Sequence, residues 1–423
     1  MGRLADESES TTVCVVGGGP AGAMVALLLA RAGVEVTLLE RHGDFLRDFR
    51  GDTVHPATLD VLDQLELAEK LHARPHHKIG SMSMIRAGKR RELADFRRLK
   101  VKFPYITMIG QWDFLDFITS EAARYPNFRL LMNSSFHDVL RADDRVCGVR
   151  YRNGDEEHEI RADLVIAADG RRSPTRAAVG LRPRAMGVSI DVVLFRLSRR
   201  DDDPKEGITL RLDGGDILGL IDRGSYWQSF VEIPKGDGIR ALRAAGIEAF
   251  RDKVVRLAPF LADRVGEIES VDALSFLDVR VDRLRRWHVP GMLVIGDAAH
   301  CMSPVGGVGV NLAVQDAVAA ANTLVEPLLR CQREEVPVPR SALAAVQRRR
   351  TLPTTTIQLL QRAALRVDLN GATAGTNMGT DDGAGAGAGL VGKLMGRVIA
   401  YGIRPERVRN KRILTPPGGE TAR

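Results

Sequence analysis

Cysteine is scarce in this sequence, which has four such residues, Cys14, Cys147, Cys301 and Cys331, among 423. They are widely separated, and none of them forms the CxxC spacing of a zinc-ligand or redox pair. The same scatter argues against the disulfide framework of a small secreted protein. We therefore expect packing residues in a reducing compartment and no metal site.

Long hydrophobic runs are also missing. The longest, over residues 23–30, is far shorter than the ~18 residues that a membrane span requires. The N-terminal stretch MGRLADESESTT is polar and lacks the apolar segment of a secretory signal. The sequence therefore predicts no transmembrane segment and no export, and we expect a cytoplasmic protein.

A clustered basic face is a third absence. The formal net charge is +7, from 61 Lys and Arg against 54 Asp and Glu, but the two signs are interleaved along the whole chain. Nucleic-acid-binding proteins concentrate positive charge on one face. We interpret the surplus as a solvated, arginine-rich surface and expect no nucleic-acid partner, while the oligomeric state stays open.

The N-terminal segment predicts a strand, a tight turn and a helix. Residues 12–16 are β-branched or apolar, residues 17–20 form a turn, and residues 21–32 are a helical run that ends at Gly33. A second buried strand is expected over residues 34–39, parallel to the first because a helical crossover joins the two. Pro56 is well placed as the first residue of a further helix.

The turn carries a GxGxxG motif, in which Gly17, Gly19 and Gly22 surround Pro20 and Ala21. A loop without side chains lets backbone N–H groups approach a pyrophosphate, and the helix start adds about half a positive charge there. The alternative is a glycine-rich turn that binds nothing. Residues 383–388 match the same pattern but follow no strand, so we assign no site to them.

Glu40 closes the second predicted strand, where an acid can accept hydrogen bonds from both hydroxyls of an adenosine ribose. Alone it would be a surface glutamate beside Arg41, which we include among the candidate cofactor-binding residues. Glycine loop, helix and strand-end acid together indicate a dinucleotide site. They do not separate FAD from NAD.

Two acids far downstream favour a flavin. Asp169 and Asp297 each follow a short apolar stretch, residues 163–168 and 292–295, that predicts a strand. Such an acid can hold the ribityl hydroxyls of a flavin, although an isolated Asp-Gly or Gly-Asp pair is more often a turn. The run GDAAHCMSPVGGVGVN, residues 296–311, continues into Pro304, Gly307, Gly309 and Asn311. Its backbone N–H groups at a helix start would suit negative charge on a reduced isoalloxazine.

The remaining segments suggest a discontinuous arrangement. Residues 1–80, 108–185 and 285–330 read as the dinucleotide-binding domain, and residues 81–107 and 186–284, rich in short alternating strands, as an inserted antiparallel substrate domain. Residues 331–423 read as a helical region with a break at Pro353 and a Gly/Ala-rich linker over residues 371–389. The apolar stripe of that region, expected to be core packing, comprises Ile357, Leu360, Ala364 and Val367.

The motifs together resemble those of flavoprotein monooxygenases of the para-hydroxybenzoate hydroxylase type, the group A aromatic hydroxylases. The resemblance covers about residues 12–330. Its motifs are GGGPAG at 17–22, RGDTVHPATLDVL from Arg50, QWDFLDFI from Gln111, ADGRRSPTR at 168–176 and the run from Gly296. It implies an α/β protein with a Rossmann-type FAD-binding domain, an inserted, mostly antiparallel β-sheet substrate domain and a C-terminal helical region.

The resemblance also assigns roles to residues. Gly17, Gly19, Gly22 and Glu40 would bind the ADP part of FAD, Arg50 and Gln111 would contact its pyrophosphate and ribityl region, and Asp297 would hold the ribityl chain. Pro304, Gly307 and Gly309 would lie beside the ring. Asp169 and Gly170 belong to a motif linked to both FAD and NAD(P)H, which makes Arg171, Arg172 and Arg176 either nicotinamide-phosphate contacts or solvated surface.

The implied activity is FAD-dependent monooxygenation with NAD(P)H and O2. Through a flavin hydroperoxide, the enzyme would hydroxylate a phenol, an aromatic acid or a polyketide-like ring. One alternative is an epoxidase, dehydrogenase or reductase of the same fold, and another is a flavin-binding interaction or redox-sensing module that recruits a partner through its tail, with the basic residues 348–350. Halogenation is disfavoured, because residues 227–234 read WQSFVEIP and lack the expected WxWxIP run.

No catalytic acid or base follows from the sequence. His55, His76, His77 and His300 are each more readily structural than catalytic. Three aromatic residues could line a pocket, but alternation along strands would place only some of them on the flavin-facing side, and core packing is the simpler role for each. These residues are Phe195, Trp227 and Phe230.

Overall fold

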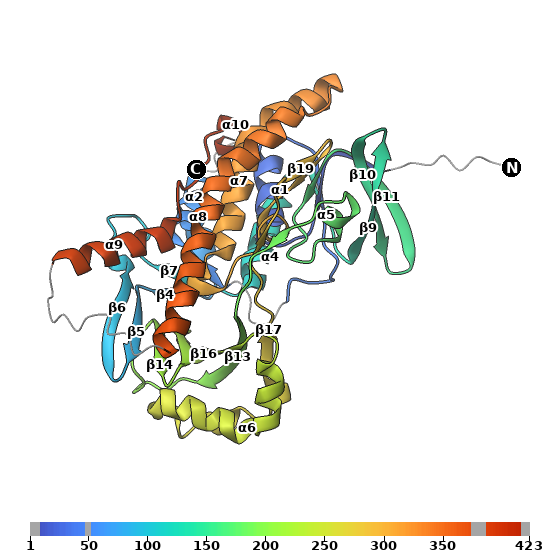
Figure 1. Cartoon of the computed structure of the whole chain (residues 1–423). Helices are drawn as coiled ribbons and strands as arrows, with labels where there is room; N and C mark the ends of the chain where they lie inside the picture. Colours follow the sequence, from blue (N-terminus) through green and yellow to red (C-terminus); the bar gives the residue numbers. More distant parts are fainter. Residues whose placement is uncertain (1–8, 47–51, 374–385, 416–423) are drawn as a thin grey trace.

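The computed structural model describes residues 9–46, 52–373 and 386–415, and within these the side chains of residues 364–373 and 386–393 are left out of the description. Two large β-sheets dominate this part of the chain (Figure 1). The mixed α/β fold predicted from the sequence is confirmed.

The first sheet is mainly parallel and is ordered β19-β20-β11-β1-β2-β8. Its central pairs β1–β11, β1–β2, β2–β8 and β11–β20 are all parallel, and β9 and β10 extend β11 as an antiparallel hairpin. Strands buried on both faces read as continuous apolar runs, as TTVCVV does here. Its strands are β1 (Glu9–Val16), β2 (Val36–Leu39), β8 (Phe128–Leu131), β9 (Ser134–Ala142), β10 (Arg145–Asn153), β11 (Glu156–Ala167), β19 (His288–Val289) and β20 (Met292–Val294).

Three helices cover one face of this sheet. α1 (Pro20–Arg31), α4 (Gln111–Ala122) and α7 (Gly309–Glu334) share one hydrophobic core with β1, β2 and β11. The helix α1 is buried along almost its whole length because α4 and α7 both pack against it. A second core on the opposite face includes Trp287 and side chains of β9 and β10.

The second sheet is mostly antiparallel, with one parallel pair, β5–β14. One face packs against α6 (Gly238–Leu257), and the other carries Ile221 and Ile208 toward the core beneath α2 (Pro56–Gln64). Its order is β17 (Ser275–Leu277), β13 (Ile190–Ser198), β16 (Tyr226–Pro234), β15 (Asp216–Asp222), β14 (Ile208–Asp213), β5 (Ser81–Arg86) and β6 (Lys89–Asp95). We propose this sheet and α6 as the substrate domain and the first sheet with its helices as the FAD-binding domain.

Small elements connect the two sheets. A three-stranded sheet joins β3 (Thr53–Val54), β7 (Ile106–Met108) and β4 (His77–Ile79), and a two-stranded one pairs β12 (Arg184–Ala185) with β18 (Asp282–Arg283). The short helices are α3 (Ala68–His72) and α5 (Pro174–Ala178), and the 3-10 turns are Phe96–Arg98, Pro259–Leu261, Val265–Glu267, Val271–Ala273, η5 (Gly296–Ala298) and η6 (Val305–Gly307).

The C-terminal helices close the fold. α8 (Arg340–Thr373) runs beside α7, α9 (Ala386–Tyr401) lies against β6, and α10 (Lys411–Leu414) packs near α1 (Figure 1). The expected break at Pro353 is wrong, because α8 continues through it. The packing of Thr354 and Ile357, both buried, outweighs the hydrogen bond that a proline removes.

Two other expectations for this region need correction. Leu360 is 43% exposed and therefore lies outside the core stripe, while Ala364 and Val367 fall among the side chains that are not described. The proposed linker 371–389 begins inside α8 and ends inside α9, and residues 374–385 lie outside the described part of the chain.

One helical stretch among the described residues, Val305–Glu334, is long and apolar enough to cross a membrane. However, 83% of its apolar 18-residue segment is buried inside the protein, as in a core helix.

Candidate flavin-binding site

The glycine loop between β1 and α1 is shaped by close backbone contacts. Gly17 has φ +102°, and a Cβ there would lie 2.7 Å from the Ala168 carbonyl oxygen. A Cβ on Gly22 would lie 1.9 Å from the Gly17 oxygen. A Cβ on Gly19, in contrast, would meet no atom within 4 Å among the described residues. Close packing thus requires glycine at positions 17 and 22, whereas the space beside Gly19 is open, and we call this space the cradle.

The start of α1 faces this cradle without a cap. Gly19 is the residue that precedes the helix, Pro20 is its first residue and Ala21 follows, and no side chain of the described residues caps the helix start. Proline suits that position because its missing N–H would be unpaired in any case. The uncapped N–H groups and the helix dipole fit a pyrophosphate.

Glu40 lies at the end of β2 and is buried. Its Oε2 accepts a hydrogen bond from the Gly18 N–H at 3.0 Å, and its Oε1 accepts one from the His42 N–H at 3.1 Å. These bonds hold the carboxylate against the glycine loop, where an adenosine ribose would lie. Arg41 points away, and its Nε donates to the His42 ring at an exposed site.

Asp169 and Asp297 are neighbours at the sheet edge, because β11 and β20 pair in parallel and each acid follows one of these strands. The Asp169 Oδ2 accepts a hydrogen bond from the Thr175 N–H at 3.0 Å, whereas its buried Oδ1 has no partner among the described residues. The Asp297 carboxylate accepts no hydrogen bond from the described part of the protein. Two carboxylates with unused acceptor capacity fit a ligand rich in hydroxyl groups.

Burial sets the electrostatics of both acids. It raises the pKa of Asp169, against the nearby polar groups of Ser173 and Thr175, which lower it. Burial also raises the pKa of Asp297, against the nearby charges of Arg171 and His300. The protein therefore keeps two carboxylates in surroundings that disfavour their charge, as expected of groups whose partners come with a ligand.

A buried ionic network lies directly behind Asp297. The Asp316 Oδ2 accepts from the Gly296 N–H at 3.0 Å and lies 2.5 Å from the His300 Nε2, and its Oδ1 accepts from the Arg350 Nε at 2.7 Å. Burial alone would raise the pKa of Asp316, but His300 and Arg350 lower it to about 2. His300 is therefore a structural residue, as the sequence suggested. Arg350, from α8, binds the same Asp316 carboxylate.

The loop before α7 contains two consecutive left-handed glycines, Gly306 with φ +77° and Gly307 with φ +62°. The Gly307 oxygen accepts from the Thr53 hydroxyl at 2.8 Å and lies 3.0 Å from the His55 Nε2. The other ring nitrogen of His55 lies 2.9 Å from the Ile399 oxygen of α9, and burial lowers the pKa of His55 to about 4. His55 is thus a buried link between this loop and α9.

The rest of the loop remains open for a ligand. Pro304 is exposed, and a Cβ on Gly309, the first residue of α7, would meet no atom within 4 Å among the described residues. No side chain within the described ranges caps α7. Asn311 is buried, and its Oδ1 accepts from the Thr58 hydroxyl of α2 at 3.0 Å, so its side chain braces the helix start.

The helix α8 holds the segment between Asp297 and this loop. The Gln358 amide donates to the oxygens of Asp282 and Cys301, and the Gln361 amide donates to those of Ser303 and Val305. All four bonds are 2.8 to 3.0 Å long. The C-terminal region therefore helps to build the candidate site instead of being a separate tail.

Gln111 begins α4, and its backbone N–H donates to the Asp52 Oδ1 at 3.3 Å. The Asp52 Oδ2 accepts from Arg223 of the second sheet at 2.9 Å, and Arg223 also donates to Gln228. Burial raises the pKa of Asp52, and Arg223 opposes this. Asp52 thus links the start of α4 to the second sheet. Arg50 lies outside the described residues.

The three arginines after Asp169 differ in their surroundings. Arg176 is buried and donates to the Ala298 oxygen at 2.7 Å and the Arg171 oxygen at 2.6 Å, so it is neither a coenzyme contact nor solvated surface. Arg171 donates to the Asp278 oxygen, and only Arg172, with 78% of its side chain exposed, is open to a ligand in solution. The expectation for Arg176, the third of these candidates, is therefore corrected.

The aromatic candidates divide between the two faces of the second sheet. Phe195 and Trp227 are buried against α6, so they are core residues. Phe230 lies on the other face, opposite Gly219 in the β15–β16 register. A Cβ on Gly219 would lie 2.0 Å from the Phe230 ring, so the ring occupies the space above the glycine. Of the three candidates, Phe230 alone lies on the face away from α6.

Several residues of the site had no recognisable sequence signal. Asp52, Asp316, Arg350, Gln358 and Gln361 act through partners tens to hundreds of positions away, so no spacing marks them. His76 and His77 lie outside this site: His76 hydrogen-bonds the Arg74 oxygen and stacks on His72, and His77 pairs in β4.

Comparison with known proteins gives a family and several relatives. The family model described as FAD binding domain matches residues 10–335. The 6-methylpretetramide 4-monooxygenase of Streptomyces rimosus is 32% identical over 357 residues, 84% of each chain. The protoasukamycin 4-monooxygenase of Streptomyces nodosus subsp. asukaensis is 26% identical over 75% of this chain and 80% of its own.

Among solved structures, PqsL from P. aeruginosa in complex with 2-aminobenzoylacetate has a TM-score of 0.73 at 20% identity, covering 86% of this chain and all of that one. This likeness concerns the fold. Three findings agree on a flavin site: the open cradle at Gly19, the unused acceptor oxygens of Asp169 and Asp297, and the family match. The chain therefore belongs to the FAD-binding domain family and, within it, to the FAD-dependent monooxygenases of the aromatic-hydroxylase type.

Proposed function

We propose that this monooxygenase uses NAD(P)H and O2 to hydroxylate a fused-ring phenol of the polyketide class. One observation carries the choice of substrate class: the 6-methylpretetramide 4-monooxygenase matches 84% of the chain at 32% identity. The flavin-facing side of the second sheet supports it, because Phe230 over Gly219 offers a flat apolar surface. We also propose that the protein works in the cytoplasm.

When bound, FAD supplies the redox chemistry, accepting a hydride from NAD(P)H and activating O2. The chain's residues supply position and electrostatics. We assign the pyrophosphate to the Gly19 cradle at α1, the ribose to Glu40 and the ribityl hydroxyls to Asp297, with Asp169 beside it. The uncapped start of α7 would stabilise negative charge at the ring.

The link Asp52–Arg223 would hold the substrate sheet against the FAD-binding domain. This contact is an ion pair between two side chains that are mostly buried. Exclusion of water from the reaction space is the expected result, and it protects reactive species from side reactions. Substrate would then bind between the Phe230 face and the flavin.

The test is substrate-dependent incorporation of oxygen. The purified protein, loaded with FAD, is mixed with NAD(P)H and a panel of fused-ring and single-ring phenols under ¹⁸O2. We expect fused-ring phenols to accelerate NAD(P)H consumption and to gain one labelled oxygen by mass spectrometry. Consumption without labelled product would assign the chain to the epoxidases, dehydrogenases or reductases of this fold. Labelled products from single-ring phenols alone would overturn the polyketide assignment.

A further inference from the structure

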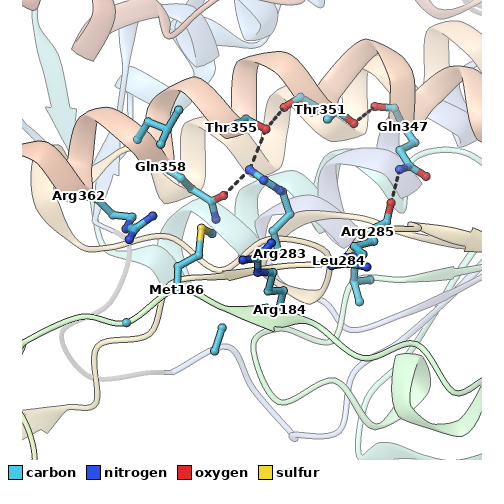
Figure 2. Close-up of a pocket in the computed structure, with 13 residues that line it drawn as sticks. Arg184, Met186, Arg283, Leu284, Arg285, Gln347, Thr351, Thr355, Gln358 and Arg362 are labelled. Carbon is cyan, nitrogen blue, oxygen red and sulfur yellow. Dashed lines mark hydrogen bonds between the residues drawn. The ribbon is translucent and has the colours of Figure 1, made fainter.

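A pocket of about 570 Å³ lies between α8 and the β12–β18 pair, and none of the residues assigned to FAD lines it. Figure 2 shows α8 along one wall and the segments of Arg184, Arg283 and Arg285 along the other. Arg362 of α8 completes a set of four arginines, which we call the arginine pocket. A volume of this order is typical of sites for small molecules.

The arginine pocket has no acidic residue in its lining. None of its four arginines forms an ion pair with any residue that the structure describes. Many exposed arginines elsewhere do lie within 4 Å of a carboxylate, as Arg152 does with Glu157 and Arg256 with Asp213. The positive charge of this pocket is therefore left uncompensated by the described protein.

The register of the small sheet concentrates this charge. Arg184 and Arg283 stand directly opposite each other in the antiparallel β12–β18 pair. Like charges in such a pair destabilise a sheet. Burial and the charge of Arg184 lower the pKa of Arg283, in agreement with this position. This repulsion between Arg184 and Arg283 destabilises the free protein. An anion bound between the two guanidinium groups would remove the repulsion, which explains the arrangement.

The pocket is also preorganised. The Arg283 Nη1 donates to the Thr355 hydroxyl at 2.7 Å and to the Gln358 Oε1 at 3.0 Å, so α8 fixes its orientation. Gln347 donates to the Arg285 oxygen at 2.8 Å on the same side (Figure 2). The Arg283 guanidinium is therefore held in place, and the backbone of Arg285 is fixed beside it; guanidinium groups match the oxygens of a phosphate in bidentate geometry.

We propose that the arginine pocket is a binding site for the phosphate groups of a small molecule. The reaction itself offers one source, the pyrophosphate and 2′-phosphate of NAD(P)H, and this assignment rests on the proposed function. A phosphorylated metabolite is the other source. Gln358 supports the coenzyme, because the same side chain holds Arg283 and donates to the Cys301 oxygen in the segment that follows Asp297.

The test separates the phosphate site from its source. Inorganic pyrophosphate is titrated calorimetrically into the FAD-loaded protein and into the double variant Arg184→Gln/Arg285→Gln, whose two positions are exposed. We expect the double variant to bind at least about tenfold more weakly, since charge-assisted hydrogen bonds are lost. The matched control is Arg286→Gln, an exposed arginine outside the lining, which should bind as the wild type does. Arg184→Lys/Arg285→Lys keeps the charge and should retain most of the affinity.

The half-saturating NADPH and NADH concentrations for flavin reduction are then measured by stopped flow. A rise of about tenfold in the double variant, with competition by pyrophosphate, identifies the coenzyme as the ligand. Loss of pyrophosphate binding in the double variant, with unchanged half-saturating concentrations of NADPH and NADH, supports the phosphate site and assigns it to a phosphorylated metabolite. No binding of pyrophosphate to the wild type, or equal binding in the double variant, overturns the proposal. Product formation is measured separately, so an outcome that overturns the phosphate site leaves the proposed hydroxylase function intact.

Discussion

At the scale of single residues, carboxylates that are wholly or partly withdrawn from solvent in this protein fall into two kinds. Asp316 has its charge matched by His300 and Arg350, which lower its pKa to about 2. Asp297 and Asp169 instead have raised pKa values because burial dominates their surroundings. The first kind stabilises the folded chain, and the second keeps acceptor oxygens ready for a ligand.

Replacement of Asp297 tests this distinction. Asp297→Ala should raise the dissociation constant for FAD by about 10- to 100-fold, because a hydrogen bond to a charged group contributes roughly 1.5–3 kcal/mol. Equilibrium dialysis followed by flavin absorbance measures the change. Asp237→Ala, which removes a carboxylate 84% exposed at the surface, is the control and should bind FAD normally. Wild-type affinity in Asp297→Ala would remove this residue from the site.

The same residue predicts a pH dependence of the FAD-free protein. Because burial raises the folded-state pKa of Asp297, the folded protein binds this proton more tightly than the unfolded chain does. The contribution to stability is therefore favourable at low pH and lost as pH rises through the folded pKa. Asp297→Asn should melt at a higher temperature than the wild type at neutral pH, with the difference shrinking toward pH 4. An equal melting temperature across that range would contradict the raised pKa.

Sequence patterns predicted some of these residues and not others. Gly17, Glu40 and Asp297 lie at strand ends or in a turn whose geometry is local, so spacing alone indicates them. Arg350 looked like part of a basic surface run, yet it is buried against Asp316, 34 positions away. A contact between distant helices leaves no periodic signal, and this explains why the network was missed.

At the scale of elements, α8 positions the loop that would contact the flavin ring. Gln361→Leu removes the bonds to the oxygens of Ser303 and Val305 and the bond from the Ser303 N–H, and should destabilise the protein by about 1–3 kcal/mol. The amount of product formed per NAD(P)H consumed should fall about tenfold or more as the loop shifts, because small misplacements at a reacting centre have large effects on the rate of the productive step. The measurement is product formed per NAD(P)H consumed.

The control for this prediction is Leu360→Ala, on the exposed side of the same helix, which should leave the ratio of product to NAD(P)H unchanged. An unchanged ratio in Gln361→Leu as well would show that α8 does not position the loop.

Element by element, the sequence predicted the first β-α-β unit within a few residues at each end, since strand, turn and helix signals are local. β11 is much longer than expected, because its first half pairs with β10 and is polar on one face. The helix α8 passes through Pro353 because tertiary packing overrides the local preference. These differences arise where a partner strand or helix, and not the local pattern, decides the structure.

At the scale of the whole molecule, the C-terminal region is part of the main core. Val338, Leu343, Val346, Val408 and Ile413 are buried in the same core as α1 and β1. The Arg31 Nε donates to the Ile413 oxygen at 3.0 Å, which fastens α10 to the first helix. The idea of a separable tail that recruits a partner does not fit this burial.

Deletion of residues 336–423 should therefore prevent folding. The truncated chain would expose core side chains and leave Asp316 buried without Arg350, an arrangement that costs about 3–5 kcal/mol for a broken buried pair. We expect insoluble or colourless protein on expression, judged by soluble yield and flavin absorbance. A soluble, yellow and active truncated protein would restore the idea of an accessory tail.

The pairing of Gly219 with Phe230 has a consequence for the evolution of this fold. The ring lies where the side chain of residue 219 would otherwise be, since a Cβ there would come within 2.0 Å of it. Any residue larger than glycine must therefore displace the ring from its place on the face away from α6. On the proposal that this face meets the substrate, position 219 sets the shape of the substrate space from beneath the ring, so relatives that act on substrates of different size are expected to differ there.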